Sequence, residues 1–176
     1  MNKHQSNLDF RLMAFFFKIR DFFKPPVEKV DKIGLSSGDR VLDYGCGTGS
    51  YSVEVARQVG PEGIVYAADI HPLAIKKIQK RAKKQGLSNI HTIQTDCKTG
   101  LEEKSIDVVI CFDMLHDVSN YQDVLSEIRR VMTEDAVFAF DDHHQEESEI
   151  LSKFTESRFE LKKKDGEQYL FVKSNN

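Results

Sequence analysis

Long hydrophobic runs are absent from this chain of 176 residues, and no stretch approaches the roughly 20 apolar residues that a membrane-spanning helix needs. The sequence therefore predicts no transmembrane segment. Arg11, Lys18 and Arg20 interrupt the apolar N-terminal stretch, which is not the layout of a secretory signal peptide, so we expect none. Internal repeats and low-complexity segments are also missing, and the length suits one domain.

Cysteine is scarce, with three residues, Cys46, Cys97 and Cys111. An odd number without a close Cys-x-x-Cys pair, together with the absent export signal, favours reduced thiols and a cytoplasmic protein. Cys46 lies between glycines, where a small residue is required, and Cys111 lies in an apolar segment, where free cysteine acts as a small hydrophobe. We therefore interpret none of the three as a reactive thiol.

Charge of one sign is not in large excess, because the formal net charge is −3. This balance argues against a dedicated nucleic-acid binder. Six basic residues crowd the segment 76–84, which could be a nucleic-acid footprint. Ala74, Ile75, Ile78 and Ala82 occupy the apolar side of that segment, so we interpret the basic residues as its solvated outer face.

Strands and helices alternate through most of the chain. Strands are predicted over 40–44, 64–69, 90–96, 106–112 and 137–140, and helices over 50–59, 72–86, 121–132 and around 150–154. Residues 159–163 and 168–172 flank Asp165-Gly166, a strong hairpin signal. Repeated strand–helix units imply right-handed crossovers. The sequence therefore predicts an α/β fold, a single-domain, doubly wound, mostly parallel seven-stranded sheet with a C-terminal antiparallel hairpin.

Residues 1–34 are predicted to be an N-terminal helical extension of a domain that covers residues 35–176. A helix is expected over 6–24, ended by Pro25-Pro26, and a short second helix stops at Gly34. The first helix has two apolar surfaces. The larger consists of Leu8, Leu12, Phe15, Phe16, Ile19, Phe22 and Phe23, and the smaller of Phe10, Met13 and Phe17.

A surface helix usually needs one apolar face, so the second surface of this helix needs a partner. That partner could be the substrate, another subunit, as in a homodimer, or a membrane surface. We favour a lid or cavity wall over an apolar acceptor, with Phe16 and Phe17 as candidates on the substrate side. Packing against the sheet is the alternative.

The most informative motif is Val41-Leu42-Asp43-Tyr44-Gly45-Cys46-Gly47-Thr48-Gly49, in which an apolar strand enters a glycine-rich loop before a helix. Glycine allows the backbone to approach a ligand closely, and a helix amino end presents free N–H groups. Asp69 ends the next strand, where a carboxylate can accept hydrogen bonds from ribose hydroxyls. Asp96 and Asp113 also lie near strand ends. These features predict a nucleoside-containing ligand.

From Leu35 to Val172 the chain resembles the class I S-adenosylmethionine-dependent methyltransferases. The resemblance is carried by the 41–49 motif, Asp69, Thr95-Asp96, the strand 107–109 leading to Asp113-Met114-Leu115-His116, and the terminal hairpin. The glycine pattern is G-x-G-x-G, whereas the usual dinucleotide fingerprint is G-x-G-x-x-G. Residues 133–136 depart from the Pro-Gly-Gly turn of many relatives, which puts the geometry of that turn in question.

The resemblance implies S-adenosylmethionine as cofactor and gives roles to individual residues. Gly45, Gly47 and Gly49, in the loop with Tyr44 and Cys46, would wrap the methionine part, and Asp43 would act on its amino group. Asp69 would hold the ribose hydroxyls and Ile70 would lie against the adenine. Asp96, beside Cys97, would accept a hydrogen bond from the adenine amine, and Phe112 and Asp113 would line the methionine side.

Catalytic residues are harder to identify, because the methyl donor is already activated and the protein mainly positions two reactants. His116 follows the fourth strand and could orient or deprotonate an acceptor. The alternative is a loop histidine that satisfies backbone groups. Asp141 to His144 could suggest a metal site, but consecutive strand residues point to opposite faces, so we predict none. Asp142, His143 and His144 remain candidates on the substrate side.

The predicted function is transfer of a methyl group from S-adenosylmethionine to a small-molecule acceptor by in-line displacement. Two alternatives stay open. A nicotinamide-dependent oxidoreductase shares the Rossmann-like sheet and the acid at residue 69, but the glycine spacing and the missing substrate domain disfavour it. A non-catalytic S-adenosylmethionine-binding protein is the other alternative.

Overall fold

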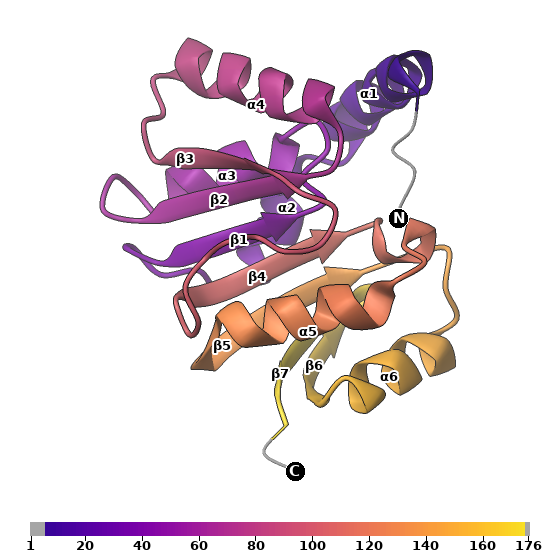
Figure 1. The fold of residues 1–176 in the computed structure, drawn as a ribbon. Coiled ribbons are helices and arrows are strands. Elements are labelled where there is room, and N and C mark those ends of the chain that lie inside the picture. The colour runs from indigo at the N-terminus through magenta and orange to yellow at the C-terminus, as the bar shows by residue number, and fades with distance from the viewer. Residues whose placement is uncertain (1–5, 175–176) are drawn as a thin grey trace.

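A computed structural model describes residues 6–174 and has one seven-stranded sheet with helices on both faces (Figure 1). The sheet order is β3-β2-β1-β4-β5-β7-β6. The strands are β1 (Arg40–Tyr44), β2 (Ile64–Asp69), β3 (Ile90–Gln94), β4 (Ile106–Phe112), β5 (Met132–Asp141), β6 (Phe159–Asp165) and β7 (Gln168–Lys173). The helices are α1 (Asn7–Phe23), α2 (Pro26–Asp31), α3 (Ser50–Gln58), α4 (Pro72–Gln85), α5 (Tyr121–Val131), α6 (Glu147–Glu156) and the 3₁₀ turn η1 (Leu115–Asp117).

The predicted fold class is confirmed. Strands β1 to β5 are parallel, and β7 lies antiparallel between β5 and β6. The chain winds outward from β1 through β2 to β3 and then returns to place β4 on the other side of β1. The winding therefore reverses between β1 and β4, where the carboxyl ends of an open α/β sheet form a ligand crevice. Residues 1–5 of the predicted N-terminal extension and residues 175–176 of the predicted domain lie outside the described residues.

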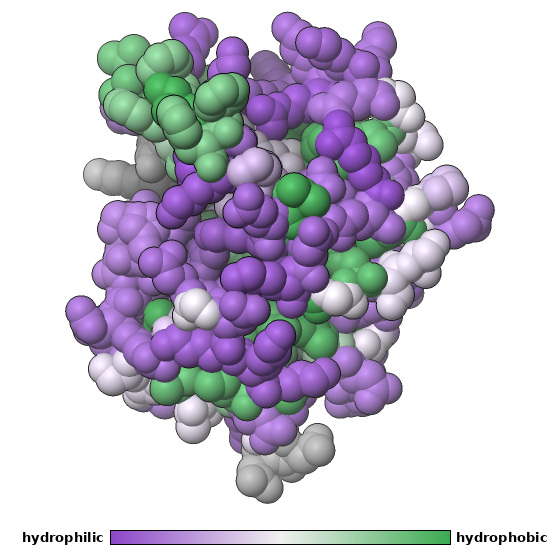
Figure 2. Space-filling view, turned by 180° about the vertical axis from the view of Figure 1, so that it is seen from behind, coloured by the Kyte–Doolittle hydropathy of each residue, from purple (hydrophilic) through white to green (hydrophobic). Residues whose placement is uncertain are grey.

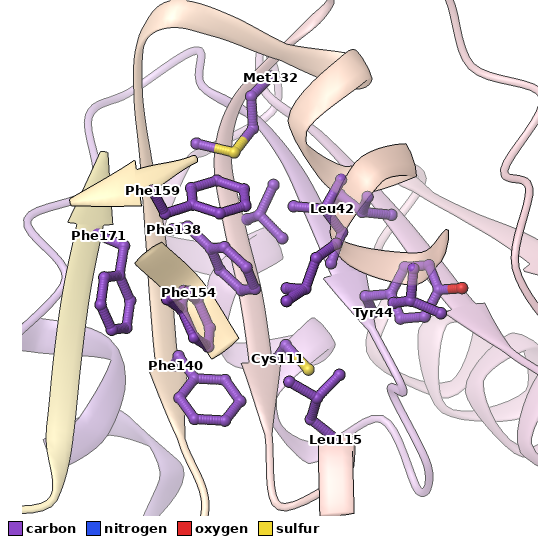
Figure 3. Packing of buried hydrophobic residues seen from close by; sticks show 14 of the residues in the cluster. Leu42, Tyr44, Cys111, Leu115, Met132, Phe138, Phe140, Phe154, Phe159 and Phe171 are labelled. Carbon is purple, nitrogen blue, oxygen red and sulfur yellow. The ribbon is translucent and has the colours of Figure 1, made fainter. Parts of the chain in front are cut away.

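Alternating side chains of the central strands separate two apolar cores. Helices α2 and α3 pack on the face that carries Val41 and Val65, whereas α5 and α6 pack on the face that carries Leu42 and Val109. Five fully buried phenylalanines dominate the second core, namely Phe138, Phe140, Phe154, Phe159 and Phe171 (Figure 3). Their rings come from β5, α6, β6 and β7, so this core joins the hairpin to the parallel sheet and holds the strand ends in place.

Strand β5 is longer than the sequence predicts, because it begins at Met132 directly after α5. Met132 pairs with Ile106 and Val137 pairs with Val108, so the intervening residues of β5 form an irregularity in the ladder. Glu134 within this irregularity lies 2.8 Å from Nζ of Lys104. The residues that depart from the Pro-Gly-Gly pattern thus sit within a bulged strand.

Helix α1 presents its smaller apolar surface to the body of the protein and leaves the larger one exposed. Phe10 is buried, and its ring stacks on that of His71 with centroids 4.5 Å apart. Ser6 caps the helix by accepting a hydrogen bond from the amide of Asp9 at 3.2 Å. Figure 2 shows the exposed surface as an apolar patch at the upper left. Among residues 6–174, α1 included, no helix is long and apolar enough to cross a membrane.

Candidate functional site

A cavity of about 190 Å³ lies at the carboxyl ends of β1, β2 and β4, beneath α1. The sheet side is lined by residues of the glycine-rich loop and of the strand ends, including Tyr44, Gly45, Cys46, Gly47, Asp69, Ile70, Thr95, Asp96, Phe112 and Asp113. Residues of α1, α3 and the η1 region complete the wall, including Phe10, Met13, Phe17, Arg20, Tyr51, Met114, Asp117 and Val118. The cavity therefore occupies the crevice where the winding reverses.

Gly45 and Gly49 shape the loop and its packing. Both have positive φ, 81° and 76°. A Cβ at Gly45 would overlap the side chain of Met114, and a Cβ at Gly49 would overlap Ile78 of α4. These two glycines let the loop turn tightly against its neighbours, and Gly49 itself does not line the cavity.

Gly47 has a different surrounding, because a Cβ built there meets nothing nearer than Phe17 at 3.7 Å. Its amide donates to Oδ2 of Asp69 at 2.8 Å, which ties the loop to the end of β2. Gly47 is thus the point where loop backbone borders open space, directly under the α1 side chain that covers it.

Asp69 is held in a fixed orientation by two backbone amides. Oδ2 accepts from Gly47, and Oδ1 accepts from the amide of His71 at 2.7 Å. Burial raises the pKa of Asp69, and the two amide hydrogen bonds oppose that rise. A carboxylate oxygen has more than one acceptor site, so this side chain can still accept hydrogen bonds from a ligand in the cavity.

Asp43 does not line the cavity. The side chain is buried below the loop, where it accepts a hydrogen bond from the hydroxyl of Ser52. Burial raises the pKa of Asp43 to about 7. Cys97 lies outside the lining as well, and its carbonyl accepts from the hydroxyl of Tyr44 at 2.8 Å. The structure therefore places both residues behind the cavity wall.

His116 and Asp142 form a pair beside the cavity. Nδ1 of His116 lies 3.0 Å from both carboxylate oxygens of Asp142, whose side chain is fully buried. Burial would raise the pKa of Asp142, but hydrogen bonds from Gln145, His116 and the His144 amide outweigh it and lower the pKa. Nε2 of His116 lies 3.5 Å from Oδ2 of Asp117, which lines the cavity. The imidazole itself is not part of the lining.

The remaining candidates on the substrate side separate into different environments. Phe17 lines the cavity, whereas Phe16 lies on the exposed surface of α1. Nδ1 of His143 lies 2.5 Å from Oδ1 of Asp113, so His143 reaches the cavity wall through that contact. The ring of His144 packs on those of His116 and His143. Within residues 6–174, no group of three or more His, Cys, Asp and Glu side chains is arranged to hold a metal ion.

Several lining residues were not identified from the sequence. Arg20 places its guanidinium 4.4 Å from the ring centre of Phe17 and 5.2 Å from that of Tyr51. His71 caps α4 by accepting from the amide of Leu73 at 3.1 Å. Asp117 lies in the η1 turn. His71 immediately precedes Pro72, a signal for the start of a helix, but its packing against α1 depends on the tertiary structure.

Next to the cavity, the buried carboxylate of Asp141 forms an ion pair with the partly exposed Lys29. Oδ1 of Asp141 has no hydrogen-bond partner among the described residues. Burial raises the pKa of Asp141 to about 6, although Lys29 opposes the rise. The ammonium of Lys29 also lies 5.3 Å from the ring centre of Phe112, so this pair supports the end of β4.

Comparisons with known proteins identify the family. A family model described as a methyltransferase domain matches residues 35–173. Aklanonic acid methyltransferase DauC from Streptomyces sp. (strain C5) is 34% identical over 127 residues, which cover 67% of this chain and 58% of that protein. Demethylmenaquinone methyltransferase from Geobacillus kaustophilus is 33% identical over 101 residues, 57% of this chain and 43% of that protein. The chain thus spans about half the length of these relatives.

The fold also matches solved structures. A SAM-dependent methyltransferase from Aquifex aeolicus superimposes with a TM-score of 0.75 at 24% identity, covering 84% of this chain and 87% of that chain. An arsenic(III) S-adenosylmethionine methyltransferase from Chlamydomonas reinhardtii gives a TM-score of 0.66 at 22% identity, with 80% and 65% covered. Together with the family model, these similarities establish that the chain belongs to the class I S-adenosylmethionine-dependent methyltransferases.

Proposed function

We propose that this protein transfers a methyl group from S-adenosylmethionine to a small, largely apolar acceptor. The observation that carries the proposal is the cavity between β1 and β4, where the fixed carboxylate of Asp69 faces a space covered by apolar side chains of α1. The polar wall suits a nucleoside and the apolar cover suits the acceptor. The relatives named for aklanonic acid and demethylmenaquinone support a small-molecule acceptor.

The residues of the cavity fit the cofactor. Asp69 would accept hydrogen bonds from the ribose hydroxyls, and Ile70 beside it would contact the adenine. Asp96 would accept from the adenine amine. Gly47 allows the methionine part to approach the backbone, because a side chain there would occupy that space. Asp43 would act from behind the loop, through the loop backbone or a water molecule.

Positioning supplies most of the catalysis in this proposal. The bound sulfonium is already an activated methyl donor, so the protein has to align the acceptor atom with the methyl group. Orientation of two reactants can lower a barrier by about 7–11 kcal/mol. Phe17, Tyr51 and Phe112 line the cavity and exclude water from the reacting atoms. A base is required only where the acceptor loses a proton, and we propose His116 for that role.

Helix α1 acts as a lid in this proposal. The cavity of about 190 Å³ is smaller than the roughly 300 Å³ at the lower end of ligand pockets. Phe17 lies close above Gly47. Admission of both a cofactor and an acceptor therefore requires α1 to move outward, which supports the division into residues 1–34 and 35–176. The three cysteines are free thiols, which supports a reducing, cytoplasmic compartment.

Thermal unfolding with S-adenosylmethionine, S-adenosylhomocysteine, NAD and NADP tests the cofactor. At about 100 times Kd, a ligand of the native state stabilises it by about 2.7 kcal/mol, so the two sulfur compounds should raise Tm by about 5–10 °C. A response to NAD or NADP alone would support the oxidoreductase. An acceptor screen with radiolabelled methyl donor tests turnover. Binding without transfer to any acceptor of a screen that includes aklanonic acid and demethylmenaquinone would support the non-catalytic alternative.

A further inference from the structure

The outer surface of α1 exposes many large apolar side chains, whereas the only other helical one among the described residues is Val27 of α2. Phe22 is 81% exposed, and Phe23 and Leu8 are each 75% exposed. The same surface continues over Leu12, Phe15, Phe16 and Ile19. Contiguous exposed apolar patches of this kind mark interaction sites. Figure 2 shows this patch at the upper left, at one corner of the molecule.

Basic side chains border this patch on the side of α4. Arg11 of α1 and Lys77 of α4 line the same shallow groove between the two helices. The next turns of α4 add further cations, and the helix contains no acidic residue; its basic residues are Lys76, Lys77, Lys80, Arg81, Lys83 and Lys84. Because the whole chain has a net charge of −3, positive charge is concentrated here.

Cations on α1 and α4 are close enough to repel one another. The pKa of Lys77 is lowered by burial and by the neighbouring charges of Arg81 and Lys18, with Asp21 opposing them. Arg81 also donates to the hydroxyl of Ser50 at 3.0 Å, which fixes it near the end of α1. An anionic surface over this region would relieve the repulsion.

We propose that the exposed face of α1 and the basic residues of α4 together form a docking face for an anionic lipid surface. Helix α1 lies in the plane of the interface, with Phe22, Phe23 and Leu8 among the acyl chains. The lysines of α4 contact the lipid headgroups. An amphipathic helix with aromatic residues on one face and basic residues beside it is the arrangement that binds membrane interfaces.

Charge favours an anionic lipid surface over a second copy of the chain as the partner of this docking face. In a two-fold dimer through α1, each apolar patch would meet its own equivalent. Where the two α1 helices run antiparallel, the basic residues of both α4 helices would also lie next to one another without a counterion. An anionic bilayer supplies apolar contact and negative charge at once. Helix α1 has 17 residues and contains Asp9, Arg11, Lys18, Arg20 and Asp21, which suits a helix that lies on a membrane.

The opposite side of the same helix covers the cavity, through Phe10, Met13 and Phe17. Outward movement of α1 at a bilayer would open the cavity toward lipid, so an acceptor dissolved in the membrane could enter without crossing water. This consequence rests on the proposed function, whereas docking itself does not.

Sedimentation of the full chain with vesicles tests the docking face without any cofactor. We expect binding to phosphatidylglycerol-containing vesicles, weaker binding to pure phosphatidylcholine vesicles, and weakening as salt rises above about 0.1 M. Phe22→Ser/Phe23→Ser should reduce the partition coefficient at least about tenfold. Lys80→Glu/Lys84→Glu should reduce it by a similar factor, since each basic residue near an anionic surface contributes about fivefold.

Matched controls come from β6, which lies at the other edge of the sheet from β3. Leu161→Ser removes an exposed apolar side chain, and Lys162→Glu/Lys163→Glu reverses two exposed charges. Neither control should change vesicle binding. Circular dichroism and binding of S-adenosylhomocysteine confirm that each variant is folded, so loss of vesicle binding is separable from loss of the proposed function.

Three outcomes would overturn the proposal. The first is failure of the wild-type chain to bind anionic vesicles. The second is equal binding by neutral and anionic vesicles or by the α4 variant. The third is a dimer in sedimentation velocity that Phe22→Ser/Phe23→Ser converts to monomer and that anionic vesicles do not dissociate. That result would assign the face to a second copy of the chain.

Discussion

Asp142 determines which nitrogen of His116 carries the proton. A buried carboxylate with a lowered pKa accepts hydrogen bonds, so the nearby Nδ1 is the donor. Nε2 is then free to accept a proton on the side of Asp117, a residue of the cavity wall. The pair has the geometry of a base held by a buried acid, and Asp142 also accepts from the backbone amides of His116 and His144.

Replacement of His116 tests this role. For an acceptor that must lose a proton, His116→Ala should lower kcat by about 10²–10⁴-fold and leave the Kd for S-adenosylhomocysteine unchanged. Single-turnover rates and equilibrium binding of S-adenosylhomocysteine measure the two effects.

The control for this measurement is His91→Ala, because His91 is exposed on β3 away from the cavity. It should react at the wild-type rate. If His116→Ala also keeps the wild-type rate, His116 serves only to order the loop after β4.

At the scale of elements, Gly49 determines how α3 meets α4. It is the N-cap of α3, in the left-handed region at φ 76°, and a Cβ there would overlap Ile78. Ile78 is fully buried against Ala67 of β2, so it has no space into which to move. Backbone strain and steric overlap thus coincide at this position.

Gly49→Ala should lower the free energy of unfolding by about 3 kcal/mol or more, because strain of about 1–2 kcal/mol adds to overpacking of similar size. Gly86→Ala is the matched control, since Gly86 has φ 67° but a Cβ there meets no atom within 4 Å. Its cost should stay near 1–2 kcal/mol. Urea unfolding measures the loss of free energy of unfolding in both variants. Equal losses would show that the side chain of Ile78 moves to accommodate the added Cβ.

Periodicity could predict that α1 has two apolar surfaces, but it could not determine which of them packs against the rest of the protein. The larger surface would be the natural choice for burial, yet Phe10 and Ala14 of the smaller side are the buried residues. The reason is tertiary, because Phe10 meets His71 and Ala74, and Asp21 accepts a hydrogen bond from Ser50. Arg20 joins the cavity wall for the same reason.

At the scale of the whole molecule, the sheet and the position of the cavity were predictable because each strand is marked locally. The run from Val41 to Tyr44 and the pair Asp165-Gly166 specify a buried strand and a hairpin with little need of their neighbours. Which acidic side chains reach the cavity and which stay buried behind it was not predictable. Asp69 faces the cavity while Asp43, one strand away, lies buried behind the loop.

Buried acids make the stability of the molecule depend on pH. The pKa of Asp43 is raised by burial to about 7, and that of Asp141 to about 6, from 3.8 in both cases. The folded state therefore holds protons that the unfolded chain has lost, so stability should fall as pH rises from about 4 to 7. Glu127 acts in the opposite direction, because hydrogen bonds from Arg130 lower its pKa to about 2. The stability that ionised Glu127 gives the folded state is lost as pH falls below about 4.5.

Asp43→Asn should remove most of this decline, because the amide keeps an acceptor for Ser52 without a charge to bury. We expect the variant and wild type to have similar free energies of unfolding near pH 4, and the variant to be more stable by roughly 3 kcal/mol at pH 8. Urea unfolding at five pH values measures the difference. Asp135→Asn, at an exposed position of β5, should follow the wild-type curve. Parallel curves for Asp43→Asn and wild type would mean that Asp43 stays ionised in the folded protein, which would place its carboxylate in contact with water.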